Sequence, residues 1–321
     1  MNRILVLGGT GFVGRDVCEK AWQLKCRVTV PTRRMENAKP IQALPWVDPI
    51  EADIHDEALL NRLLRGHDAV VNLVAILHGT QAEFSRVHVE LVKKLVNACR
   101  VGGVRRLVHV SALGASSNAA SMYQRSKAEG EAVLAASGLD VSILRPSVIF
   151  GAGDQLLNLF AKLQATFPIM PLGGADARFQ PVWVEDVAQA IIHLLGDRAA
   201  VGASGGKGEA PVYEACGPEV FTLKQLVQLA GRLSETERPV LSLPSALARL
   251  QAVLMEWVPG RPLLSRDNLA SMQTDNVSGG VLPGIEKLGI TPGALSAIAP
   301  AYLQPRETNQ LLARRRAAGR F

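Results

Sequence analysis

The chain of 321 residues has few cysteines and no long hydrophobic run, and each absence excludes a class of protein. No apolar stretch reaches the roughly 18 residues of a membrane span, which excludes a transmembrane helix. The sequence enters a strand-like run at residue 3 with no secretory leader, so we expect a cytoplasmic protein. No Cys-x-x-Cys pair occurs, which favours buried free thiols over a disulfide framework. The four cysteines are Cys18, Cys26, Cys99 and Cys216.

Metal-ligand spacing and clustered aromatic residues are lacking as well. None of the six histidines is spaced with cysteine, aspartate or glutamate as metal ligands are, so we expect no metal site. His88 and His109 lie in apolar surroundings and are interpreted as structural. Aromatic residues make up 5% of the chain and do not interleave with basic ones, which excludes a nucleic-acid surface built on base stacking.

Basic charge is concentrated at the end of the chain. The whole sequence has 35 basic and 29 acidic residues, and these numbers fall to 30 and 28 without residues 304–321. This basic tail has two open interpretations. It contacts an anionic membrane surface or an acidic partner, or it is a solvated helix end.

Three glycines follow the first strand-like run at a spacing of three residues. Gly8, Gly11 and Gly14 come directly after Ile4–Leu7, where a helical pattern begins. Gly8 allows a tight turn, Gly11 lets a pyrophosphate approach the backbone, and Gly14 lets the helix pack closely. Because the amino end of a helix attracts anions, the motif predicts a dinucleotide site.

Strand-like runs alternate with helical patterns through the first half of the sequence. Strands are expected near 3–8, 27–31, 69–74, 105–110 and 140–145, and helices near 12–24, 56–65, 83–101 and 122–137. The alternation predicts an α/β fold with a doubly wound, Rossmann-type parallel sheet. Ligands of such sheets bind at the carboxyl ends of the strands.

The pattern changes after residue 150 and predicts a second, smaller part. We expect residues 1–150 to form the dinucleotide-binding domain, with 181–200 returning to it. Residues 151–180 and 201–303 are expected to form a mostly helical substrate lid, followed by the basic tail. A short strand at 212–216 and helices near 222–233, 244–257 and 265–272 are assigned to this lid. The helix near 244–257 is either lid core or a surface for a membrane or partner.

Tyr123 and Lys127 are four residues apart and share one face of an expected helix. Ser111 lies just beyond the strand-like run that ends at Val110. A phenol titrates near pH 10 unaided, and a neighbouring ammonium lowers its pKa. With a serine hydroxyl to hold a carbonyl oxygen, the three side chains predict acid–base catalysis of hydride transfer with nicotinamide.

Arginines follow the second strand where an NAD site usually has an acidic residue. Arg33 and Arg34 would meet a 2′-phosphate, and no acidic residue occurs between this strand and Glu36. We therefore expect NADP(H), as NADPH, in preference to NAD. The alternative is that the two arginines belong to a solvated turn.

Taken together, these motifs resemble the short-chain dehydrogenase/reductase superfamily, of the extended or atypical kind. The matching pieces, in family order, are Gly8–Gly14, Ala52–Ile54, Asn72–Ala75, Ser111, Tyr123 with Lys127, Arg145–Gly151 and Val182–Ala188. Val28–Arg34, His109–Ala115, Leu263–Leu269 and Asp275–Val277 are similar to the NAD(P)H-binding accessory subunits of respiratory complex I and their bacterial relatives.

The resemblance implies a full set of cofactor contacts. Asp53 and Ile54 would border the adenine, Val74 and Ala75 would line the nicotinamide side, and Lys127 would reach the ribose. The cofactor set is Gly8, Thr10, Gly11, Phe12, Val13, Gly14, Arg33, Arg34, Asp53, Ile54, Val74, Ala75, Lys127, Pro146, Ser147 and Val148.

Two functions remain open at this point. One is an oxidoreductase that acts on a hydrophobic carbonyl or quinone-like substrate through Ser111, Tyr123 and Lys127. The other is a cofactor-bound structural or assembly factor of a membrane respiratory complex, without turnover. The second would place the protein peripherally at the inner face of the membrane.

Overall fold

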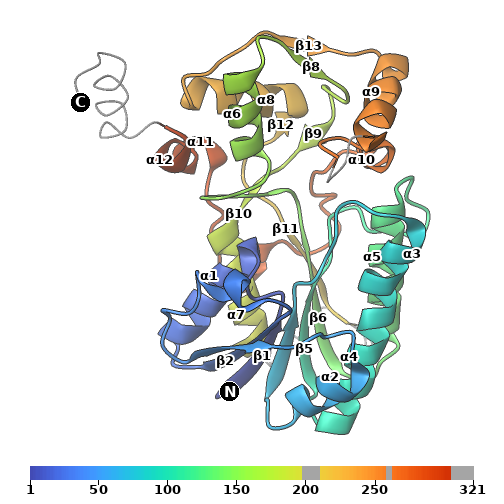
Figure 1. Ribbon diagram of the computed structural model, residues 1–321. Helices are drawn as coiled ribbons and strands as arrows, with labels where there is room; N and C mark the ends of the chain where they lie inside the picture. The colour runs from blue at the N-terminus through green and yellow to red at the C-terminus, as the bar shows by residue number, and fades with distance from the viewer. Residues whose placement is uncertain (197–209, 258–261, 305–321) are drawn as a thin grey trace.

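Seven parallel strands form the main sheet of the computed structural model, which describes residues 1–196, 210–257 and 262–304 (Figure 1). Their order across the sheet is β11-β6-β5-β4-β1-β2-β3. They are β1 (Arg3–Leu7), β2 (Arg27–Thr32), β3 (Val47–Glu51), β4 (Ala69–Asn72), β5 (Arg106–Val110), β6 (Asp140–Pro146) and β11 (Val212–Ala215). The strand order reverses between β1 and β4, which confirms the predicted doubly wound Rossmann sheet.

Helices cover both faces of this sheet, which is why its strands are apolar on both sides. α1 (Phe12–Gln23) and α7 (Val184–Gly196) pack on one face, where Ile4 and Val6 of β1 point. α2 (Glu57–Leu64), α4 (Leu91–Gly102) and α5 (Met122–Ala135) cover the other, where Leu5 and Leu7 point. α7 lies within the 181–200 segment that was expected to return to the sheet, and it packs on the same face as α1.

A π-helical turn interrupts the helix expected near 83–101. α3 (Gln81–Ser85) leads into this turn at Arg86–Glu90, and α4 continues from it. The turn packs against α5 so closely that a Cβ at Gly130 would lie 2.4 Å from the His88 carbonyl oxygen. Such turns often mark functional sites, because they redirect one side chain within a helix.

The lid lies beyond the carboxyl ends of the strands (Figure 1). Its own core contains Phe150, Leu226 and Leu295. Two short strands, β7 (Ile149–Phe150) and β10 (Val182–Trp183), pair where the chain leaves and re-enters the sheet layer. The lid elements are α6 (Leu157–Thr166), β8 (Met170–Leu172), β9 (Arg178–Phe179), β12 (Phe221–Thr222), α8 (Leu223–Leu233), β13 (Val240–Ser242), α9 (Ser245–Trp257), α10 (Arg266–Ser271), α11 (Leu295–Ile298) and α12 (Pro300–Leu303). The described residues also contain 3-10 turns at Met35–Ala38 and Ile285–Leu288.

Two strands of the sheet differ from the sequence expectation. β3 was not expected, because its sequence Val-Asp-Pro-Ile-Glu has two acidic residues and a proline. It pairs only with β2 as an edge strand, where proline is tolerated. β11 was expected as a strand but assigned to the lid, and this assignment is wrong because it pairs with β6. The basic tail beyond Gln304 lies outside the described residues.

Helix α9 turns its small residues inward and its large apolar ones outward. Ala248 and Ala252 are buried, whereas Leu250 and Leu254 are about half exposed and Trp257 is 80% exposed. The large side chains of the 244–257 segment therefore do not form lid core. In the described part of the chain, no helix is long and apolar enough to cross a bilayer.

The contact between Gly130 and the π-helical turn predicts a stability effect. Gly130→Ala should lower the free energy of unfolding by about 1–3 kcal/mol, because the new Cβ meets backbone that cannot shift freely. Gly279→Ala is the control, since nothing lies within 4 Å of a Cβ there. Urea unfolding of both variants measures the effect, and equal stabilities would contradict it.

Candidate functional site

The glycine loop between β1 and α1 has the geometry that its sequence predicts. Gly8 has φ +83° and accepts a hydrogen bond from Gly11 N at 2.9 Å, which closes the turn. A Cβ at Gly14 would lie 2.3 Å from the Gly8 carbonyl oxygen and 2.5 Å from Gly9 Cα, so helix and turn are in close contact. Sequence reasoning missed Gly9, whose Cβ would lie 2.8 Å from a Val30 methyl.

The amino end of α1 can receive an anion. Its cap residue, Gly11, makes no side-chain hydrogen bond, and its first turn has no acidic residue. By contrast, Asp56 caps α2 and Ser121 caps α5. The first N–H groups of α1 thus have no side-chain acceptor, and the half-buried Thr10, Phe12 and Val13 flank them. The residues present fit the pyrophosphate of a dinucleotide.

A group of cations surrounds the carboxyl ends of β2 and β3. Arg33 and Arg34 are exposed just after β2, with the Arg34 backbone bonded to the Thr32 hydroxyl. Asp53 follows β3 and accepts from His55 N, while Ile54 is half-buried.

Two cations that the sequence analysis did not select lie near the same point. Lys94 donates to the His55 carbonyl at 2.7 Å. Burial and then the charge of Arg86 lower the pKa of His55, and Lys94 and Arg33 contribute in the same direction. Both new cations belong to the π-helical turn and α4, so no local pattern near Arg33 could indicate them.

The loop after β4 contacts the glycine turn. A Cβ at Gly8 would lie 3.3 Å from the Leu73 backbone, and Leu73 N donates to the Leu7 carbonyl. Val74 N donates to Asn72 Oδ1 at 3.2 Å, and Ala75 is exposed next to it. This arrangement brings the predicted nicotinamide-side residues to the same edge as the glycine loop.

Two buried histidines join this loop to β5 and α5, and their hydrogen bonds define their tautomers. Because Asn72 Oδ1 accepts from Val74, its amide donates to His109 Nδ1 at 3.1 Å, and Nε2 carries the proton. That Nε2 is buried without a partner among the described residues. Burial, followed by the charges of Lys127 and His88, holds the pKa of His109 well below its usual range.

His88 links the cofactor loop to the turn of Tyr123. Its Nε2 accepts from Ile76 N at 3.2 Å, so its Nδ1–H donates to Ser126 Oγ at 2.8 Å. Ser126 Oγ in turn donates to the Tyr123 carbonyl at 2.8 Å, and the rings of His88 and Tyr123 are 5.7 Å apart. Burial and the Lys127 charge lower the pKa of His88 to about 3. Both histidines are therefore neutral structural groups, in agreement with the sequence interpretation.

The structure brings the helix of Tyr123 and Lys127 to the end of β5. Lys127 is 2% exposed, and its Nζ donates to the Val110 carbonyl at 3.1 Å. Ser111 is the next residue along the chain; its N–H donates to the Leu144 carbonyl, and its Oγ is buried without a partner in the described structure. An unsatisfied buried hydroxyl is costly, so this one is suited to a ligand oxygen.

Burial shifts the pKa values of Tyr123 and Lys127 in opposite directions. The pKa of Tyr123 rises to about 12, and that of Lys127 falls to about 8. The expected lowering of the phenol pKa by Lys127 is wrong for this structure, because burial disfavours the charged form of each group. At neutral pH the phenol keeps its proton, which suits it to donate one.

Pro146 is the last residue of β6, and Ser147 and Val148, which follow it, meet a residue of the lid segment. Ser147 Oγ donates to Asn276 Oδ1 at 2.6 Å, and Val148 N donates to the same oxygen at 3.1 Å. The only sequence signal for Asn276 was its place within Asp275–Val277. Its amide holds the loop after β6 in position beside the predicted site.

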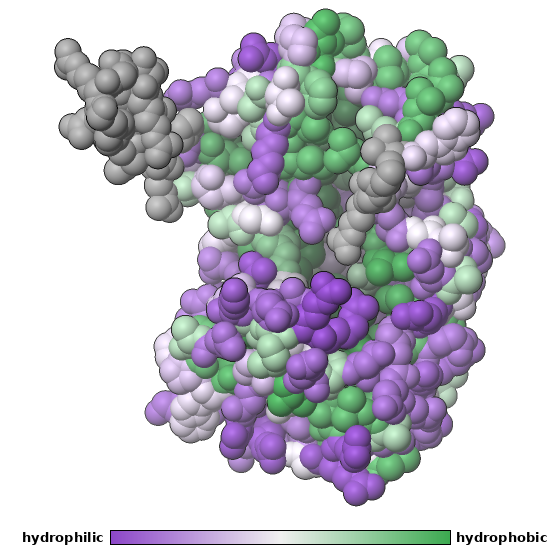
Figure 2. Space-filling model, in the orientation of Figure 1, coloured by the Kyte–Doolittle hydropathy of each residue, from purple (hydrophilic) through white to green (hydrophobic). Residues whose placement is uncertain are grey.

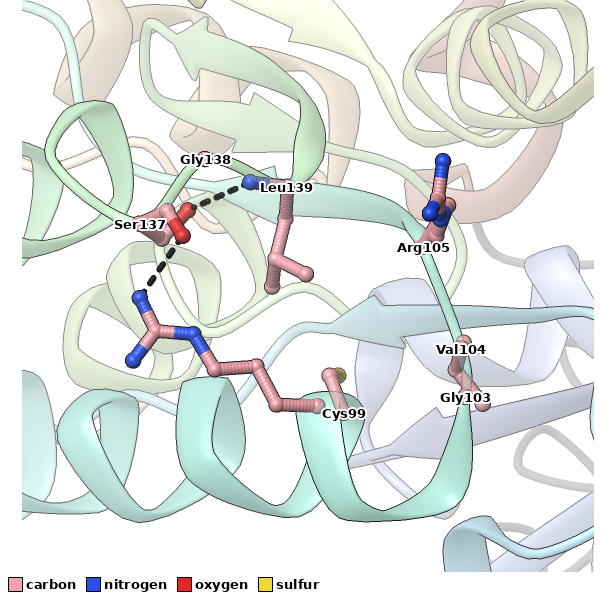
Figure 3. A pocket seen from close by; sticks show the side chains of 8 residues that line it. Cys99, Gly103, Val104, Arg105, Ser137, Gly138 and Leu139 are labelled. Carbon is pink, nitrogen blue, oxygen red and sulfur yellow. Dashed lines mark hydrogen bonds between the residues drawn. The ribbon is translucent and has the colours of Figure 1, made fainter.

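Figure 2 shows a hollow between the sheet layer and the lid, with apolar surface along part of its rim and hydrophilic residues along its lower, sheet-side edge. A separate pocket, of about 400 Å³, lies at the opposite edge of the sheet (Figure 3). Its lining includes Arg100, Arg105 and Ser137, near the amino ends of β5 and β6. It is remote from the glycine loop and from Tyr123, so it is not the candidate site. In the described ranges, no three His, Cys, Asp or Glu side chains cluster as metal ligands would.

Comparisons with known proteins agree with this geometry. A mitochondrial NADH dehydrogenase (ubiquinone) 1 alpha subcomplex subunit 9 of Arabidopsis thaliana is 28% identical over 313 residues, which cover 93% of this chain and 76% of the relative. A ceramide reductase of Caulobacter vibrioides is 29% identical over 191 residues, 59% of each chain. The solved dTDP-glucose 4,6-dehydratase DesIV of Streptomyces venezuelae superposes with a TM-score of 0.69 at 22% identity, over 94% of this chain and 95% of that one.

The dehydratase shares its fold with this chain, and the other two relatives are similar to it in sequence. Residues 4–205 match the NAD dependent epimerase/dehydratase family, a stretch that contains the glycine loop, Ser111, Tyr123 and Lys127. The chain therefore belongs to the NAD dependent epimerase/dehydratase family.

Proposed function

We propose that the protein is an NADP(H)-dependent reductase of a hydrophobic carbonyl or quinone-like substrate. The observation that carries the proposal is the hydrogen bond from Lys127 Nζ to the Val110 carbonyl. It holds the Tyr123 helix against the end of β5, beside the Ser111 hydroxyl that lacks a partner in the described structure. In this proposal Tyr123 supplies a proton donor, Lys127 a charge and Ser111 a hydrogen bond.

The protonation states favour reduction. NADPH, when bound, supplies the hydride. Ser111 Oγ–H donates a hydrogen bond to the substrate oxygen and orients it, and the Tyr123 phenol transfers its proton to that oxygen as negative charge develops there. Lys127, one turn further along α5, holds the cofactor ribose in this proposal, and its hydrogen bond to the Val110 carbonyl keeps α5 in place. The Phe84 and His88 rings pack against Tyr123 and add to the burial that keeps its phenol protonated.

The choice of NADP(H) rests on charge at the carboxyl end of β2. Arg33 and Arg34 are exposed there, and Arg86 and Lys94 lie close enough to affect His55 nearby. A 2′-phosphate adds negative charge and acceptor oxygens at this end of a dinucleotide, and arginine suits it because it can bind two oxygens at once.

The substrate class rests on two supports. The relative from Caulobacter vibrioides is named a ceramide reductase. The lid core is built from apolar side chains, and apolar surface borders part of the hollow in Figure 2. A lipid or quinone carbonyl fits such surroundings better than a sugar does.

A second candidate is a cofactor-bound subunit or assembly factor, peripheral to a membrane complex. It is favoured by the 93% of this chain that aligns with a respiratory NADH dehydrogenase subunit, against 59% for the reductase. The exposed leucines of α9 would then face a partner or a membrane, and the basic tail would assist. Both candidates use the same cofactor site.

Removing the two arginines tests the cofactor choice. Arg33→Ala with Arg34→Ala should weaken NADPH binding at least about tenfold, because each charge-assisted bond contributes roughly 1.5–3 kcal/mol. NADH affinity should change little. Calorimetric titration with both cofactors measures this, with Lys39→Ala as a control near the same surface. Equal wild-type affinities for the two cofactors would contradict the 2′-phosphate interpretation.

Tyr123→Phe tests the reaction. It should lower turnover of a carbonyl or quinone probe by about 10²–10⁴-fold, the usual contribution of a positioned proton donor, with NADPH affinity unchanged. NADPH oxidation at 340 nm with 9,10-phenanthrenequinone and long-chain ketones is the measurement. A variant as active as wild type would refute the assignment. Tight NADPH binding without turnover by the wild type would favour the second candidate.

Burial of Lys127 predicts a pH dependence of stability. Its pKa is about 8 in the native state and about 10.5 in the unfolded state, so the unfolded state binds more protons between these values. Wild type should therefore gain about 1–2 kcal/mol relative to Lys127→Met as pH rises from 7 to 9.5. Urea unfolding at both pH values measures this. A difference that does not change with pH would show that the ammonium is not desolvated.

A further inference from the structure

The lid reaches the amino end of the helix that carries Tyr123. Asp267, in the first turn of α10, accepts a hydrogen bond from Met122 N at 2.6 Å and another from Tyr123 N at 3.1 Å, one on each carboxylate oxygen. These partners are 145 and 144 residues away in sequence. One side chain thus joins the lid to the turn that holds the phenol.

Helix α5 has no local group that could replace this carboxylate. Its cap residue, Ser121, accepts from Gln124 N at 3.1 Å, and the first turn contains no acidic residue. The N–H groups of Met122 and Tyr123 would otherwise have no acceptor, because a single cap side chain satisfies only one of the first N–H groups. The negative charge of Asp267 also suits the positive end of the helix dipole.

The position of Asp267 is itself set by lid elements. Ser265 and Asn268 exchange hydrogen bonds that fix the start of α10. Arg266 donates from its backbone and its guanidinium to the two oxygens of Glu256 on α9, at 2.7 and 2.8 Å. A displacement of α9 or α10 would therefore be transmitted to the Tyr123 turn through two carboxylates.

We propose that Asp267 is a positioning residue that fixes the Tyr123 phenol and makes the arrangement of the lid part of the active site. The proposal rests on the role of Tyr123 given under the proposed function. Asp267 touches neither substrate nor cofactor in this scheme and acts through the backbone of α5. A displacement of the lid by bound substrate would be transmitted to Tyr123 through Asp267.

Spectroscopy of the tyrosines tests the proposal without any need for turnover. The chain has three tyrosines, so 3-fluorotyrosine labelling gives three fluorine signals, and Tyr123→Phe identifies the one of interest. Asp267→Asn and Asp267→Ala should shift or broaden the Tyr123 signal while those of Tyr213 and Tyr302 stay in place. Asp267→Asn keeps the volume of the side chain and serves if the alanine variant fails to fold.

Glu219→Gln is the matched control. Glu219 also accepts from the start of a lid helix, through Ser296 N at 2.9 Å and Ser296 Oγ at 2.6 Å, but it touches no part of α5. It should leave the Tyr123 signal unchanged. A Tyr123 signal that stays in place in both folded Asp267 variants would overturn the proposal, as would an equal shift in the Glu219 variant.

Turnover separates this proposal from the proposed function. With NADPH and 9,10-phenanthrenequinone, Asp267→Asn should lower kcat at least about tenfold and leave KM nearly unchanged, because a small misplacement of a catalytic group is costly. Unchanged kcat would overturn the positioning role. Absence of turnover in wild type would refute the reductase assignment only, and the fluorine signals would then decide the role of Asp267.

Discussion

The burial of the Lys127 ammonium constrains every polar group around it. A charge removed from water is costly unless it is bonded, and the structure supplies the Val110 carbonyl as its hydrogen-bond partner and Glu131 as a nearby opposite charge. The imidazoles nearby stay neutral chiefly because they are themselves buried, and the Lys127 charge lowers their pKa values further. His88 and His109 are accordingly held neutral, each with one tautomer fixed by its hydrogen bonds. Burial and the Lys127 charge thus act in the same direction on both imidazoles, and the hydrogen bonds of Asn72, Ile76 and Ser126 fix their tautomers.

This constraint also explains how distant segments meet at one edge of the sheet. His88 bonds to the backbone of Ile76 in the loop after β4 and, through Ser126, to the carbonyl of Tyr123 on α5. The π-helical turn brings His88 to this position, and the absence of a side chain at Gly130 allows the turn to approach α5. These hydrogen bonds fix the loop after β4 and helix α5 relative to each other.

Local patterns in the sequence could predict most of the α/β alternation, the glycine turn and the spacing of Tyr123 and Lys127, because each is encoded within a few residues. β11 was recognised as a strand, but its pairing with β6 could not be predicted, since nothing local specifies which strand it joins. The roles of Asn276 and Asp267 could not be predicted for the same reason, because each side chain accepts hydrogen bonds from backbone more than 120 residues away.

The predicted direction of the Tyr123 pKa shift was wrong for another reason. The sequence indicates a charge nearby, but the extent of burial is a property of the packed structure. Burial of the phenol outweighs the expected effect of a neighbouring ammonium whose own charge is itself disfavoured.

The path of the chain between the two layers has a consequence for how the protein can be divided. After Phe150 the chain enters the lid, returns through β10 and α7 to the sheet core, and contributes β11 before it enters the lid again. The turn at Ile285–Leu288 packs once more on the sheet core before α11 joins the lid. No single cut therefore separates the lid from the sheet, and neither layer is a contiguous segment. An exchange of lids between relatives would therefore require several junctions at once.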